Sequence, residues 1–197
     1  MDKVELLKKI KAECKSAGVK VSIRNVGYVI MSGQIKCAGY FDSLGRELVV
    51  ALNHSHGLET IVHEFCHFLQ WNEQCKAWVD NCDSIEMVDL WLSGEDIPDI
   101  DRHISNVRDL ELDNEIRSVN LIKTFGLEPE INPEKYTQRA NAYITFYNWL
   151  KISRRWPDPK NTPYTNERIV NAMSTKFDMN YETLDPYIEE LFKMENI

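Results

Sequence analysis

The residues that decide the fold are Glu59-Thr60-Ile61-Val62-His63-Glu64-Phe65-Cys66-His67-Phe68-Leu69-Gln70-Trp71. Five apolar members of this stretch give a helix one apolar side: Ile61, Val62, Phe65, Phe68 and Leu69. An apolar side of this kind fixes a helix in a hydrophobic core. The stretch therefore predicts a core helix over about residues 58–73.

The chain before this helix has the composition of a small sheet. β-Branched and aromatic residues form short runs, which predict strands at residues 19–23, 28–31, 35–40 and 47–52. Asp42-Ser43-Leu44-Gly45 separates the last two runs and has the polar and glycine content of a hairpin turn. A helix over residues 4–17, ended by Gly18, is expected to precede the strands.

The chain after the core helix has helical periodicity. We predict helices near residues 84–93, 101–125, 133–153, 166–174 and 186–194. Asn132 and Asp185 each precede a proline, which is typical of a capped helix start. The predicted fold class is α+β, with a small antiparallel sheet followed by a helical bundle. Because no repeat or low-complexity segment interrupts the chain, we expect one domain over residues 1–197. Its first part, to about residue 56, would hold the N-terminal helix and the sheet, and its second part, from about residue 57, would be helical.

The core helix contains the pattern H-E-x-x-H, in His63-Glu64-Phe65-Cys66-His67. Residues four apart share a helix face, so His63 and His67 can converge on one zinc ion, which neutral imidazoles hold at about 2.0–2.1 Å. Glu64 lies beside that position, where its carboxylate can act as a base without being a ligand. Cys66 falls off the histidine face, and we interpret it as a small buried residue. The alternative is a surface pair of histidines without a metal.

A catalytic zinc site needs a third protein ligand and an open position for water. The segment Leu110-Glu111-Leu112-Asp113-Asn114-Glu115 is dense in acids, and Glu111 and Glu115 share a helix face. The chain between His67 and Glu111 is long enough for a connecting helix and a return to the motif. Glu111 is the first candidate for the third ligand, and Asp113 is the second.

On these residues the sequence resembles the gluzincin peptidases, in which a second helix with E-x-x-x-D follows the H-E-x-x-H helix. The resemblance implies a zincin-like fold in which Glu111 is the third zinc ligand and Glu115, in place of the aspartate, is a partner of a zinc-binding histidine. The sequence is also similar to small ImmA/IrrE-type peptidases in three segments: Ala38-Gly39-Tyr40, the strand that ends before Asn53, and Thr60 to Glu64. The whole is also similar to small metallopeptidases encoded by tailed phages, over about residues 38–125.

The resemblance implies a zinc-dependent peptidase that hydrolyses an intracellular protein or peptide. Glu64 would accept a proton from the attacking water and pass it to the departing amine. The substrate would lie extended along a sheet edge. Residues 47–52 are the candidate edge, and a simple buried strand is the alternative. Tyr143 and Tyr147 are candidates for the wall of a cleft, with core packing as the alternative.

Two other functions fit parts of the pattern. The sequence is also similar to SprT-like (Spartan) proteases, whose pattern H-E-x-C-H-x-x-x-W matches His63-Glu64-Phe65-Cys66-His67 followed by Trp71. These proteases act on proteins crosslinked to DNA and use a further histidine as ligand. We interpret His103 as a surface residue near a helix start, with a ligand role as the alternative. His54 and His56 are interpreted as polar loop residues. The remaining function is a non-catalytic metal-binding or interaction protein with the same fold.

Composition narrows the partners and the compartment. The chain has 23 basic and 31 acidic residues, hence a net charge of −8, which argues against nucleic acid as a partner. An odd number of cysteines, five, argues against a disulfide framework and for a reducing compartment. No run approaches the roughly 18 apolar residues of a membrane span, and the N-terminus has no signal-peptide pattern. We therefore expect a cytoplasmic protein.

Overall fold

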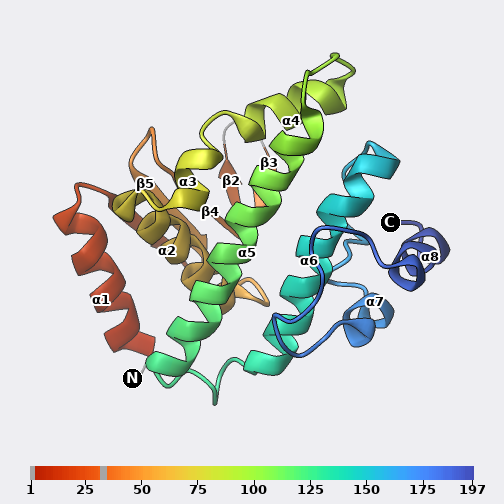
Figure 1. Cartoon of the computed structure of the whole chain (residues 1–197). Coiled ribbons are helices and arrows are strands. Elements are labelled where there is room, and N and C mark those ends of the chain that lie inside the picture. The colour runs from red at the N-terminus through yellow and green to blue at the C-terminus, as the bar shows by residue number, and fades with distance from the viewer. Residues whose placement is uncertain (1–2, 32–34) are drawn as a thin grey trace. The chain divides into compact units, whose positions relative to one another are not determined.

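The computed structural model describes residues 3–31 and 35–197. Its chain divides into two compact units, each described here by itself. Unit 1 consists of residues 1–75 and 117–131, and unit 2 of residues 76–116 and 132–197. Figure 1 labels the helices and strands of both. Among the described residues, no helix has the length and apolar content that crossing a bilayer requires. The combination of helices with small sheets confirms the α+β class.

The main sheet of unit 1 has three strands in the order β1 (Lys20–Arg24), β5 (Glu47–Ala51) and β4 (Gly39–Asp42). β5 pairs parallel with β1 and antiparallel with β4, so the expectation of a purely antiparallel sheet is wrong. A separate antiparallel pair joins β2 (Val29–Met31) and β3 (Ile35–Cys37). The strand predicted over residues 35–40 is thus two strands that pair in different sheets, with a break at Ala38.

β5 is the central strand, which settles the two interpretations of its apolar run. Leu48, Val49, Val50 and Ala51 are all buried, and the strand has a neighbour on each side. The prediction that residues 47–52 form a free edge is therefore wrong, and the buried-strand alternative is confirmed. Within the described part of the chain, the two edges of this sheet are β1 and β4.

Helix α2 (Gly57–Glu73) packs on this sheet. Its apolar side is buried as predicted except at Leu69, which is half-buried. The ring of Phe41 on β4 lies 6.0 Å from that of Phe68 and 5.8 Å from that of Trp71. Gly39 allows the close approach of the two elements. A Cβ at Gly39 would lie 2.8 Å from the methyl group of Thr60 and 2.9 Å from the carbonyl oxygen of Val49.

Helix α1 (Lys3–Ser16) completes the core of unit 1, with Leu6, Ile10 and Cys14 fully buried. Burial raises the pKa of the Cys14 thiol to about 12. None of the five cysteines forms a disulfide, and Cys66 is buried, as predicted.

The start of α2 depends on a glycine. A Cβ at Gly57 would lie 2.6 Å from the carbonyl oxygen of Leu52 and 2.8 Å from that of Ala51, and both oxygens belong to the backbone, which has little freedom to move away. We expect Gly57→Ala to lower the free energy of unfolding by about 1–3 kcal/mol, as overpacking does. Gly27→Ala is the matched control, because no heavy atom would lie within 4 Å of its new methyl group. Equal urea midpoints for the two variants would contradict this account.

Unit 2 is helical. It contains α3 (Lys76–Asp80), α4 (Ser84–Ser93), α6 (Pro133–Ser153), α7 (Glu167–Ala172), α8 (Pro186–Met194) and the part of α5 (Ile100–Thr124) before residue 117. Asn132 and Asp185 accept hydrogen bonds from the first free backbone N–H groups of α6 and α8, which confirms the predicted caps. α3 was not predicted, because it has only five residues and none of them is buried.

The core of unit 2 is built around α6, whose residues from Ile144 to Leu150 are all buried. α6 runs antiparallel to α5. Near its start the hydroxyl of Tyr136 donates to Glu115 at 2.6 Å, while near its end Asn148 shares the carbonyl oxygen of Tyr181 with Arg108. Glu111 and Tyr143 each lie between these two points on their helices.

Candidate metal centre

His63 and His67 lie on the same face of α2, as their spacing predicts. Their ring centroids are 4.7 Å apart and the ring planes are nearly perpendicular, at 87°. Both side chains are half-buried, whereas Val62 and Cys66, the residue before each histidine, are buried in the core. The core thus fixes the helix, and with it the separation of the two imidazoles.

Gln70 orients the second histidine. The Oε1 atom of Gln70 lies 2.9 Å from Nδ1 of His67, and Gln70 is fully buried. Because a carbonyl oxygen only accepts, Nδ1 of His67 is the donor in this bond, which leaves Nε2 as the candidate metal-binding atom. A metal-binding histidine is commonly oriented by such a bond to its other nitrogen. Gln70 was missed in the sequence analysis, although it lies one helical turn after His67 and could have been found by that spacing.

We expect Gln70→Ala to weaken zinc binding by about 10–100-fold, the usual cost of losing a partner that orients a metal ligand. Asn72→Ala is the control, since Asn72 is an exposed residue of the same helix. Competition with a chromogenic zinc chelator measures both affinities. Equal affinities for the two variants would remove Gln70 from the site.

Glu64 is half-buried and acts electrostatically on the β2–β3 pair. The pKa of the Cys37 thiol, on β3, is raised first by burial and then by the negative charge of Glu64. The charge of Glu64 therefore reaches a group of the β2–β3 pair. Cys37 is a neighbour of Glu64 that the sequence pattern did not predict.

The acid-rich part of α5 places its carboxylates in different surroundings. Glu111 and Glu115 are buried, with exposed fractions of 8% and 6%, whereas Asp113 is half-buried. Glu115 accepts the hydrogen bond from Tyr136. Its expected role as a partner of a zinc-binding histidine stays a prediction.

His63, His67 and Glu111 form a group that could hold a metal ion, because one ligand atom from each lies within 4.8 Å of the others. Among residues 3–31 and 35–197, this is the one group of three or more His, Cys, Asp or Glu side chains with that property. Donors bound to one zinc ion lie about 3.4 Å apart in a tetrahedron, which is within this limit. Two imidazoles and one carboxylate are also the ligands of catalytic zinc sites that keep an open position. The donor set fits zinc.

The other histidines lie outside this group. His103 is 4% exposed, and its Nδ1 lies 3.2 Å from the hydroxyl of Ser84, so its interpretation as a surface residue is wrong. It is buried because α4 covers the start of α5, a contact that local sequence does not reveal. His54 and His56 lie in the turn before α2, as expected, and Nδ1 of His56 lies 3.0 Å from Glu59.

Tyr143 and Tyr147 form a hydroxyl pair on α6. Their oxygens are 2.8 Å apart, and the ring of Tyr147 is buried, which confirms core packing for that residue. Desolvation raises the pKa of both phenols well above the ordinary value, and the charge of Glu111 raises it further. Both therefore stay protonated at neutral pH and within the electrostatic reach of Glu111.

In comparisons with known proteins, no family model, curated protein or solved structure matches this chain. The resemblance to gluzincin and ImmA/IrrE-type peptidases therefore stays a prediction from the motif residues.

Proposed function

We propose that the protein is a zinc-dependent peptidase. The observation that carries the proposal is the group of His63, His67 and Glu111, whose donors come from the motif helix and from the acid-rich helix. Glu64 follows the first of these ligands directly. This combination supplies three protein ligands and a carboxylate beside them that is not a ligand, which is what metal-assisted hydrolysis of an amide needs.

His63, His67 and Glu111 would hold the zinc ion, which when bound would lower the pKa of a water molecule and polarise a substrate carbonyl. The chain supplies the other parts of the reaction. Gln70 accepts a hydrogen bond from Nδ1 of His67, so that Nε2 would be the atom that binds the metal. Glu64 accepts a proton from the attacking water and delivers it to the amine that leaves.

Two further features support a peptide as substrate. β4 is a sheet edge next to α2, where an extended peptide can add as a strand and be held by its backbone whatever its sequence. In the pair of Tyr143 and Tyr147, one hydroxyl hydrogen is used within the pair, and the other is available for a further acceptor. A developing oxyanion is such an acceptor.

The DNA-associated alternative receives no support from this geometry. Its third ligand would be a histidine, but the third donor in the group is Glu111, and His103 is not a member. The net charge of −8 also disfavours binding to a polyanion.

Metal analysis combined with peptide digestion tests the proposal. We expect about one zinc per chain, and cleavage of a peptide mixture that 1,10-phenanthroline abolishes and added zinc restores. Mass spectrometry of the products identifies the cleaved bonds. Zinc binding without any cleavage would favour the non-catalytic alternative, and absence of zinc would reject both.

A further inference from the structure

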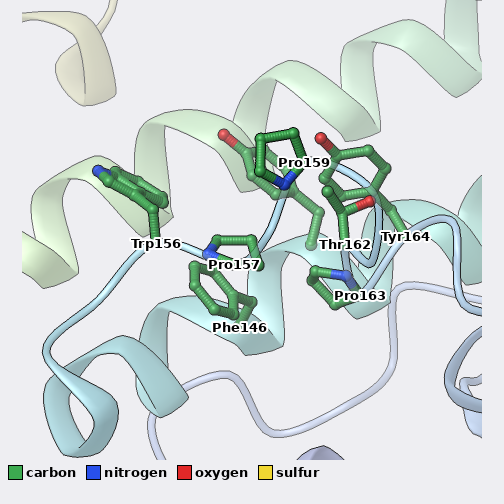
Figure 2. Close-up of a pocket in the computed structure, with 8 residues that line it drawn as sticks. Phe146, Trp156, Pro157, Pro159, Thr162, Pro163 and Tyr164 are labelled. Atoms are coloured by element: carbon green, nitrogen blue, oxygen red, sulfur yellow. The ribbon is translucent and has the colours of Figure 1, made fainter. Parts of the chain in front are cut away.

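Unit 2 contains a pocket of about 250 Å³ between α6 and the chain that follows it. Figure 2 shows the side chains that line it. Phe146 lies on α6, and Trp156 and Tyr164 come from the segment that returns over this helix. Tyr143 provides a fourth ring, and Thr162 and three prolines complete the wall.

The lining is apolar and contains no charged side chain. A ligand charge placed there would lose hydration without finding an ion partner, which is costly. Pockets for drug-sized ligands measure about 300–1,000 Å³, so a volume below that range suits a single large side chain. The apolar lining and the small volume of the pocket therefore favour an aromatic or large aliphatic side chain as its ligand.

The wall is held in place before any ligand arrives. The indole of Trp156 stacks on Phe146, with ring centroids 5.9 Å apart, and meets Tyr147 edge-on at 6.1 Å. Asp89 accepts a hydrogen bond from Trp156. Prolines 157, 159 and 163 restrict the backbone of the returning segment, and Thr162 and Thr165 join their hydroxyls at 2.7 Å. A preformed pocket binds with little ordering cost.

Tyr143 connects the pocket with Glu111, the candidate metal ligand of the same unit. α5 and α6 run antiparallel. The bond of Tyr136 to Glu115 fixes one end of the pair, and the carbonyl oxygen shared by Arg108 and Asn148 fixes the other. Tyr143 and Glu111 therefore lie in the same central stretch of the helix pair. The ring of Tyr143 is part of the pocket wall, and its hydroxyl bonds to Tyr147. One side chain thus belongs both to the pocket and to the surroundings of the metal ligand.

We propose that this pocket is the specificity subsite of the peptidase, and that it receives an aromatic or large aliphatic side chain of the substrate next to the cleaved bond. The inference rests on the proposed function, since it assigns the substrate class of that same site. It predicts cleavage beside residues such as Phe, Leu or Met, and not beside Asp, Glu, Lys or Gly.

Binding tests the pocket without requiring cleavage. The probes are N-acetyl-L-phenylalanine methylamide and, as the comparison, N-acetylglycine methylamide. The indole N–H signal of Trp156, assigned with Trp156→Phe, is followed by NMR in the zinc-loaded protein. We expect this signal to shift saturably with the phenylalanine probe, at an affinity about 10–100-fold above that of the glycine probe. Equal shifts with both probes, or none, would overturn the proposal.

Two variants locate the binding. Tyr164→Ala removes a ring of the pocket that is 39% exposed, and should weaken phenylalanine binding about tenfold. Tyr187→Ala removes a tyrosine of α8 that is 66% exposed and does not line the pocket, and should leave binding unchanged. A similar loss in both variants would overturn the assignment to this pocket.

Digestion of a peptide mixture separates this inference from the function on which it rests. If zinc-dependent cleavage occurs without preference for large apolar residues, the peptidase stands and the subsite is wrong. If nothing is cleaved but the phenylalanine probe binds, the pocket is an apolar side-chain site and the peptidase assignment is wrong. The inference is supported in full when cleavage favours apolar residues and Tyr164→Ala weakens that preference.

Discussion

Glu64→Gln should lower the rate of peptide cleavage by about 10²–10⁴-fold, while zinc content and melting temperature should remain at the wild-type level. The amide has nearly the shape of the carboxylate but accepts no proton at neutral pH, so the proton of the attacking water has no acceptor. Because Glu64 is not in the metal-binding group, its replacement leaves the three donors in place. The cleavage rate is checked by initial rates on a peptide identified by digestion. The zinc content is checked by mass spectrometry.

Glu73→Gln is the matched control for Glu64→Gln, because Glu73 is an exposed glutamate of the same helix. It pairs with Arg117 at 2.6 Å, a surface ion pair whose loss costs at most about 1 kcal/mol. The control should retain full activity. If Glu64→Gln also cleaves at the wild-type rate, Glu64 is not the base. If it loses zinc, Glu64 contributes to metal binding.

Glu111→Ala would remove the proposed third ligand and should weaken zinc binding by more than the 10–100-fold that follows the loss of an orienting partner. The purified variant should retain well under one zinc per chain after gel filtration. In the wild type, zinc at about 100 times its dissociation constant should stabilise the fold by about 2.7 kcal/mol. The variant should lose most of this stabilisation, seen as a smaller zinc-dependent rise of the melting temperature.

Asp113→Ala is the comparison for the third ligand. Asp113 lies two residues after Glu111, hence on the other side of α5, and it is not in the metal-binding group. It should bind zinc as the wild type does. Zinc loss in Asp113→Ala together with retention in Glu111→Ala would reverse the assignment, and retention in both would place the third donor elsewhere.

Much of the fold follows from local chemistry that is visible in the sequence. The start of α6 and of α8 was predicted because an asparagine or aspartate before a proline supplies both a cap and a fixed backbone angle. α2 was predicted because its apolar spacing matches a single helix face. The candidate metal donors follow from the same spacing, since His63 and His67 must share a face once the helix forms.

The sheet was predicted less well, because strand order depends on contacts distant in sequence. Lys20 of β1 pairs with Glu47 of β5, 27 residues later, and nothing within either strand indicates that the pairing is parallel. For the same reason, the burial of His103 under α4 lay outside the pattern arguments. The pocket was also missed, since three prolines and a tryptophan after α6 resemble an ordinary loop until they fold back on it.

Because β4 is short, it could bind only a short segment of a polypeptide through backbone hydrogen bonds. The strand has four residues, a span of about 13 Å, and only alternate residues direct their backbone N–H and C=O groups outward. Two residues of the edge can therefore bond a guest strand. So few main-chain bonds would favour a short, already unfolded stretch of polypeptide over a folded surface, and would leave the choice of target to individual side chains.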